Sequence, residues 1–193
     1  MLKKYFKVLF NKREAKMTKP ISEQRLYNIT LFYLERFDAS ALKVKQMLER
    51  RIQKEKAKGA IVPNNTQALI QNVINRMQNL GYINDERFAQ SQIKKLCSAG
   101  KSKSFILNKL KQAGIAGEIA KNLLSEFDLE NESSDLTRAE QWLKKHRKGQ
   151  FRSKNADEFY QKDLAALARA GFSYEIASSA LKTQPSSDEG PYF

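Results

Sequence analysis

Apolar residues recur at intervals of three and four positions along most of this 193-residue chain. That spacing places them on one face of an α-helix and is typical of helices packed against a core. The first predicted helix begins at Ser22, the second follows a cap at Asp38 or Ser40, and the third covers about residues 67–80. The polar residues 54–66 predict a loop before the third helix. The predicted inward residues are Leu26, Ile29, Thr30, Tyr33, Leu34 and Phe37, then Leu42, Val44, Met47, Leu48 and Ile52, then Leu69, Ile70, Val73, Ile74 and Met77.

The same order of helices returns twice further along the chain. The acidic, serine-containing residues 129–135 predict a linker between these two rounds. No segment longer than a few residues alternates as a strand would, so the sequence predicts an all-α fold. The helix that begins near Gly117 is predicted to bury Ile119, Leu123, Leu124 and Phe127. The six helices are predicted at residues 84–98, 102–114 and 117–127, and then at 136–148, 156–170 and 173–183.

Internal repetition gives these helices an architecture. The segment Leu110–Ala120 matches Leu167–Ala177 at a constant offset of 57, with Leu, Ala, Gly, Glu, Ile and Ala in the same places. Gly114 and Gly171 are equivalent positions at which a helix ends and the chain turns. We therefore expect three tandem three-helix repeats that form an elongated, curved molecule. The expected divisions are a basic extension at 1–21, repeats at 22–80, 81–128 and 129–183, and a disordered tail at 184–193.

Residues 81–89 join the first predicted repeat to the second. Gly81 follows a helical run and is expected to close that helix in the left-handed conformation. Asn84 or Asp85 is expected to cap the next helix, whose positive end favours acidic side chains. Three large side chains are expected to fix the entry angle of the chain, as in a hydrophobic staple: Tyr82, Ile83 and Phe88.

The chain contains 35 Lys and Arg against 21 Asp and Glu, which gives a formal net charge of +14. A surplus of this size favours an anionic partner: nucleic acid, an acidic membrane surface or an acidic protein surface. Each predicted repeat carries its own cluster of cations, and stacked repeats would align the clusters along a long anionic partner. The predicted contact residues are Lys43, Lys45, Arg50, Arg51, Lys94, Lys95, Lys103, Lys109, Lys111, Lys144, Lys145, Arg147 and Lys148.

Side chains that could carry out catalysis are sparse. His146 is the only histidine and lies in a basic run, so we expect it to be part of a solvated basic helix end and not a catalytic group. Cys97 is the only cysteine and is expected to be a buried or half-buried thiol, so the sequence predicts no disulfide framework and a reducing cytoplasm. It contains no phosphate-binding loop of the GxxxxGK type and no HExxH motif. We therefore expect a protein that is not an enzyme, uses no metal or other cofactor and spans no membrane.

Residues 1–20 carry several lysines against one acid, Glu14. We interpret them as a mobile basic arm. The alternative is an amphipathic helix from Leu2 to Phe10 that would rest on a membrane surface or a partner. Met17 is an alternative start of the protein.

The run Leu80–Ala89, with the sequence Leu-Gly-Tyr-Ile-Asn-Asp-Glu-Arg-Phe-Ala, resembles the bacterial RecX family. The resemblance covers about residues 22–183 and departs from the family pattern in the loop 54–66 and in residues 1–20. It implies three tandem three-helix repeats and a regulator of the RecA recombinase. It also implies binding in the groove of the RecA–DNA filament, which hinders ATP hydrolysis, strand exchange, coprotease activity and filament extension. The family-motif positions assigned to the joint are Gly81, Tyr82, Asp85, Arg87 and Phe88.

The resulting hypothesis is a monomer that obstructs the filament groove with its cations and without chemistry. Several weak contacts on one rigid body act at high effective concentration, so modest affinity per repeat suffices. Two alternatives stay open: a helical protein that binds single- or double-stranded DNA without sequence preference and without RecA, and an adaptor for an acidic protein. Within the predicted set, the strongest candidates for electrostatic contact are Lys103, Lys109, Lys111, Lys144, Lys145 and Arg147.

Overall fold

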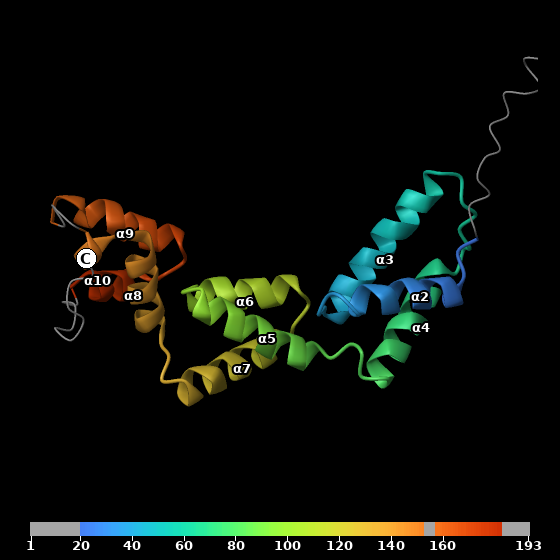
Figure 1. Cartoon of the computed structure of the whole chain (residues 1–193), viewed down its shortest axis with the longest axis horizontal. Coiled ribbons are helices and arrows are strands. Elements are labelled where there is room, and N and C mark those ends of the chain that lie inside the picture. Colours follow the sequence, from blue (N-terminus) through green and yellow to red (C-terminus); the bar gives the residue numbers. More distant parts are fainter. Residues whose placement is uncertain (1–19, 153–156, 183–193) are drawn as a thin grey trace, which may run out of the picture. The chain divides into compact units, whose positions relative to one another are not determined.

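The computed structural model describes residues 20–152 and 157–182, and every regular element in these ranges is helical (Figure 1). The predicted all-α class is confirmed for these residues. The predicted N-terminal arm or helix and the predicted tail at 184–193 lie outside them. The elements are α2 Glu23–Leu34, α3 Ala41–Lys56, α4 Thr66–Asn79, α5 Asp85–Ser98, α6 Lys103–Gln112, α7 Gly117–Glu130, α8 Asp135–His146, η1 Gly149–Phe151, η2 Asp157–Phe159, α9 Tyr160–Arg169 and α10 Tyr174–Lys182.

The chain divides after Asn84 into two compact units. In the first unit, α2, α3 and α4 surround one apolar core that includes Leu26 and Met77. Ser22 and Ser40 cap α2 and α3: each hydroxyl accepts a hydrogen bond of 3.3 Å from the N–H three residues later. These bonds satisfy backbone donors that the first turn of a helix leaves open, and they fix where both helices begin.

The second unit contains two apolar cores, one among α5, α6 and α7 and one among α8, α9 and α10. Leu110 in the former and Leu167 in the latter are almost fully buried. Ser102 connects the two groups of helices, because its hydroxyl accepts from the Phe105 N–H at 3.2 Å and donates to the Ala170 carbonyl at 3.0 Å. Each core is built from three helices. The tandem stacking of three repeats and the elongated, curved shape stay predictions.

Gly81, Gly114 and Gly171 each end a helix in the left-handed conformation. The φ angles are +73° at Gly81, +84° at Gly114 and +91° at Gly171, which confirms the predicted role of all three. In each case the next residue donates its N–H to the carbonyl five positions earlier, as in the Schellman motif. These bonds run from Tyr82 to Met77 at 2.9 Å, from Ile115 to Leu110 at 3.1 Å and from Phe172 to Leu167 at 3.2 Å. The offset of 57 therefore relates residues with the same backbone role.

We expect Gly171→Ala to destabilise the protein more than Gly81→Ala. Both substitutions place a side chain at positive φ, which costs about 1 kcal/mol. A Cβ at Gly171 would lie 2.7 Å from Ser102 Oγ, whereas a Cβ at Gly81 meets nothing within 4 Å. The overlap raises the expected cost at Gly171 to about 3 kcal/mol. Urea denaturation measures both losses, and equal losses would contradict the close approach to Ser102.

Two residues predicted to face the core are instead largely exposed, so these two predictions are wrong. Phe37 is 56% exposed, because α2 ends at Leu34 and helical periodicity no longer sets its direction. Ile119 is 49% exposed, since it lies at the edge of the face that Ala120 and Leu124 turn inward. Tyr82 is 48% exposed, whereas Ile83 is buried in the first core; the expected role of Tyr82 in fixing the entry angle stays a prediction.

The predicted bounds fit less well near the C-terminal end of the described residues. The helix predicted at 136–148 ends at His146, and the short 3-10 turn η1 follows it. The helix predicted from residue 156 begins at Tyr160, after the 3-10 turn η2. Short 3-10 turns at helix ends carry no period-3.6 signal over a useful length, so the sequence pattern could not separate them from the helices.

Candidate nucleic-acid interface

The predicted contact residues of the first unit lie on α3. Arg50 and Arg51 are exposed, whereas Lys43 and Lys45 are half-buried. Arg50 donates its Nε–H to the Gln46 carbonyl at 3.2 Å, a bond that leaves its charge uncompensated. Arg51 donates to Glu55 at 2.9 Å, and the same carboxylate lies 2.6 Å from Arg25. Arg51 therefore shares an acidic partner within the unit, while Arg50 is better placed to meet an external anion.

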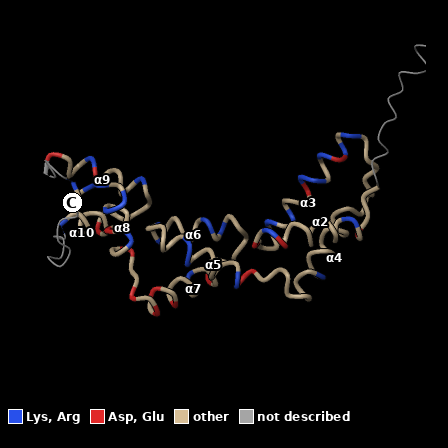
Figure 2. Tube along the Cα trace, in the orientation of Figure 1, with Lys and Arg blue, Asp and Glu red and all other residues tan. Residues whose placement is uncertain are grey.

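The predicted contact residues on α5 and α6 are all exposed: Lys94, Lys95, Lys103, Lys109 and Lys111. Helix α6 contains no acidic residue, and Figure 2 shows its cations along the trace. The Lys109 ammonium lies 5.6 Å from the centre of the Phe105 ring. The lysines in the last turn of α6 also interact favourably with the negative end of the helix dipole. Helix α6 therefore offers cations without acids of its own.

Helix α8 ends in a third group of exposed cations, Lys144, Lys145 and Arg147. Arg147 closes the helix at a φ of +51°, a left-handed conformation that costs energy for any residue with a Cβ. The neighbouring His146 ring stacks on Trp142 with 4.1 Å between centroids, and its Nδ1 lies 2.7 Å from the Trp142 carbonyl oxygen. As predicted, this histidine is an exposed member of a basic helix end.

Lys148 differs from the other predicted contact residues, because it takes part in a buried ionic cluster. The Asp163 side chain is fully buried and accepts hydrogen bonds from Lys148 Nζ at 3.0 Å and from the Gly149 N–H at 2.8 Å. Arg152 donates to both carboxylate oxygens, at 2.8 and 2.7 Å. Burial opposes the charge, but these donors outweigh it and hold the pKa of Asp163 well below its usual range. The Lys148 ammonium thus has a structural partner, and its contact with an external anion stays a prediction.

We expect the protein to lose stability as the pH falls below about 4, with Asp163 as a main contributor. A depressed carboxylate pKa stabilises the folded state above the unfolded pKa and ceases to do so as acid protonates the group. Urea denaturation between pH 6 and pH 2 gives the free energy of unfolding at each pH. Asp163→Asn should be less stable at pH 6 and should show a shallower decline. A decline of unchanged slope would contradict the assignment.

A second buried charge, Arg138 on α8, ties α5, α7 and α8 together. Its side chain is 1% exposed and donates to Asp128 at 2.6 and 3.3 Å and to Asp135 at 3.3 Å. Burial disfavours the guanidinium charge, yet the bonds to Asp128 raise its pKa above the usual value. Cys97 lies beside it, with 3.7 Å between Sγ and the guanidinium, and burial raises the pKa of the thiol. The predicted buried thiol is confirmed.

Sequence reasoning did not identify Arg138 or Asp163 as buried charges. For Asp163 a signal was present, because it lies one helical turn before Leu167 on the inward face of α9. A charged residue at such a position must be paired or neutral. For Arg138 the sequence alone gave no comparable signal.

The family-motif residues fall on both sides of the boundary between the two units. Gly81 and the exposed Tyr82 belong to the first unit, whereas Asp85, Arg87 and Phe88 belong to the second. Phe88 is 1% exposed and packs into the core of α5, α6 and α7. Asp85 lies in the first turn of α5, where its negative charge interacts favourably with the positive end of the helix dipole. At Gly81 and Phe88 the motif thus has clear structural roles, a helix end and a core side chain.

Comparison with known proteins identifies the family. No family model matches the chain. Over 175 residues, 90% of this chain and 92% of the other, it is 30% identical to regulatory protein RecX of Myxococcus xanthus strain DK1622. The chain belongs to the RecX family. It is also 30% identical over 117 residues to regulatory protein RecX of Bacillus subtilis strain 168, which is 58% of this chain and 42% of that protein.

Solved RecX structures have the same fold. The crystal structure of RecX from Lactobacillus salivarius matches with a TM-score of 0.61 at 20% identity, over 83% of this chain and 94% of that one. A second crystal structure of regulatory protein RecX matches with a TM-score of 0.61 at 18% identity, over 82% of this chain and 70% of that one. The RecX relatives are named as regulatory proteins and not as enzymes. In the part of the chain that the structure describes, none of the helices combines the length and the apolar character of a membrane span.

Proposed function

We propose that this RecX-family protein inhibits the RecA recombinase by binding in the groove of the RecA–DNA filament. It thereby hinders ATP hydrolysis, strand exchange, coprotease activity and filament extension, and so acts in DNA repair by homologous recombination and in the SOS response. The observation that carries the proposal is the 30% identity to a RecX protein over nearly the full length of both chains. The exposed cations of α3, α6 and α8 supply the complementary charge.

Inhibition of this kind needs no reactive group. A bound obstacle in the groove keeps substrates and further RecA subunits from their sites, and each cation contributes a small part of the binding free energy. Clusters on one chain act at high effective concentration, so several weak contacts give tight binding. The described residues include no group of three or more His, Cys, Asp or Glu placed to hold a metal ion.

If the protein binds through phosphate contacts, its affinity must fall as the salt concentration rises. The logarithm of the affinity falls with the logarithm of salt concentration by roughly 0.7 to 0.9 per neutralised phosphate. If about six cations meet phosphates, a tenfold rise in salt weakens binding by about four to five orders of magnitude.

The test measures RecA-catalysed ATP hydrolysis on single-stranded DNA with this protein present at a small fraction of the RecA concentration. Strong inhibition at sub-stoichiometric protein supports action on the filament. The alternative is a helical DNA-binding protein that acts without RecA, which the net charge of +14 favours. It predicts inhibition only near saturation of the DNA, and that result would contradict the proposal.

A further inference from the structure

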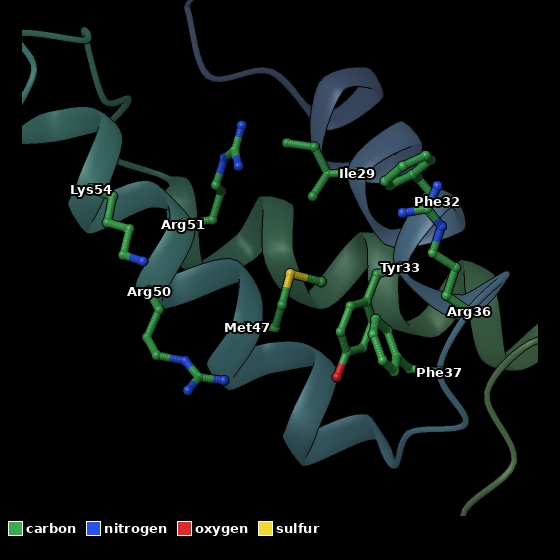
Figure 3. Close-up of a pocket in the computed structure, with 9 residues that line it drawn as sticks. All are labelled: Ile29, Phe32, Tyr33, Arg36, Phe37, Met47, Arg50, Arg51 and Lys54. Carbon is green, nitrogen blue, oxygen red and sulfur yellow. The ribbon is translucent and has the colours of Figure 1, made fainter.

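An open cavity with an aromatic wall and a cationic rim lies between α2 and α3 in the first unit (Figure 3). Its volume is about 380 Å³, within the range of small-ligand sites. Figure 3 shows Phe32 on the side of α2, Met47 of α3 between the two helices, and the Tyr33 and Phe37 rings next to each other. The Tyr33 and Phe37 centroids are 5.2 Å apart at a tilt of 35°.

Phe32 and Phe37 are more exposed than is usual for large apolar side chains. Phe32 and Phe37 are each 56% exposed, although three helices of this unit provide an apolar core for such side chains. Large apolar side chains gathered at the surface are characteristic of a binding site. Both rings leave area open to a planar ligand.

Cations surround the aromatic wall. The Arg36 guanidinium lies 4.2 Å from the centre of the Phe32 ring. This cation–π contact holds the guanidinium charge beside the opening of the cavity. On the opposite side, Arg50 and Lys54 are exposed and lie one turn apart on α3, about 6 Å along the helix axis. The Glu55 carboxylate of the same helix is taken up by Arg25 and Arg51 and so leaves these cations available.

The geometry points to a subsite for single-stranded DNA, in which one or two unstacked bases lie against Phe32 and Phe37 and the adjoining phosphates meet Arg50 and Lys54. Exposed aromatic faces beside spaced cations are the two components of single-strand binding sites, because every base has a face that stacks and every linkage has a charge. A base inside a duplex cannot enter the cavity, so the subsite discriminates between single and double strands. This inference rests on the proposed function in so far as it supplies a DNA contact for the filament-bound protein.

The test compares two probes of about 12 nucleotides by fluorescence anisotropy: labelled oligothymidylate, and an abasic oligomer with the same number of phosphates. The wild-type protein should bind the first about 10-fold more tightly, since the stacking of one base contributes about that factor to the affinity. Phe32→Ala/Phe37→Ala should lose that preference and leave the abasic affinity unchanged. Phe32→Trp/Phe37→Trp should retain it. Wild-type affinity of the alanine variant for oligothymidylate would overturn the inference.

Controls separate stacking, charge and folding. Tyr174→Ala removes an aromatic side chain that is 70% exposed in the second unit and should change neither affinity. Arg50→Gln/Lys54→Gln should reduce the salt slope by about 1 to 2 for both probes, whereas the phenylalanine variants should keep the wild-type slope. Circular dichroism verifies that each variant is folded. We expect all of them to fold, because the substituted side chains are exposed.

The same variants test whether the cavity binds an acidic peptide instead of single-stranded DNA. A labelled glutamate-rich peptide with one central tryptophan would also complement an aromatic, cationic cavity. If the alanine variant loses this peptide but keeps oligothymidylate, the cavity is a peptide site and the inference is overturned. Because these assays contain no RecA, their failure leaves the proposed inhibition standing, and a negative ATPase result leaves the subsite standing.

Discussion

The double substitution Lys109→Glu/Lys111→Glu should abolish inhibition of RecA-catalysed ATP hydrolysis without loss of helical content. Both side chains are exposed in the last turn of α6, a helix without acids of its own, so reversal changes charge and not packing. Placing acids opposite phosphates costs several kcal/mol, because like charges meet where opposite charges met before. That cost corresponds to at least about a 100-fold increase in the concentration needed for half-inhibition.

A matched control isolates the position of the charges from their number. Lys162→Glu/Lys182→Glu makes the same change in net charge, from +14 to +10, at two exposed lysines outside the predicted contact set. We expect this variant to inhibit RecA nearly as well as the wild type, with a small loss from weaker long-range attraction. Full inhibition by the α6 variant, or an equal loss in both variants, would contradict a specific contact through α6.

The single variants Lys109→Glu and Lys111→Glu add a geometric test. Residues two positions apart on a helix point to different sides, so these two ammonium groups cannot meet the same phosphate. One of the two variants should therefore account for most of the loss, and that residue marks the side of α6 that faces the anion.

The second large effect is expected at the buried ionic cluster of the second unit. Asp163→Ala should lower the free energy of unfolding by about 3–5 kcal/mol. The substitution leaves Lys148 and Arg152 facing each other without their shared carboxylate, and it removes the acceptor of the buried Gly149 N–H. Urea denaturation at pH 7 gives the loss.

The exposed ion pair between Glu118 and Lys121 provides the comparison. Its atoms lie 3.0 Å apart, but the glutamate side chain is 82% exposed, so water replaces the partner when either residue is changed. Glu118→Ala should cost less than about 1 kcal/mol. A loss at Asp163 as small as the loss at Glu118 would contradict a stabilising role for the buried cluster.

The helices were predictable because their information is local. The three- and four-residue spacing located each helix of the described residues, and the cap at Ser40 and the ends at Gly81, Gly114 and Gly171 follow from backbone chemistry that a sequence states directly. Predictions failed where this information ends. Phe37 lies beyond the last turn of α2, so the position of its ring depends on the loop and not on the helix.

For the candidate site, the sequence predicted which residues are cationic but not which of them form ion pairs within the protein. The sequence identifies which residues are cationic, and the structure places those of α6 and the end of α8 at the surface. It also shows Lys148 held by Asp163 and Arg51 held by Glu55. Lys148 and Asp163 are 15 residues apart, so no local pattern reveals the pair. The aromatic cavity was missed for a related reason, because Phe37 was assigned to the core.

The most direct test of the central claim measures binding to the filament itself. RecA filaments are assembled on labelled single-stranded DNA with a slowly hydrolysed ATP analogue, and the affinity of this protein for them is compared with its affinity for the same DNA without RecA, at equal salt. Action on the filament predicts binding at least about 10-fold tighter to the filament, since contacts with RecA add to contacts with DNA. Equal or weaker binding to the filament would contradict the account.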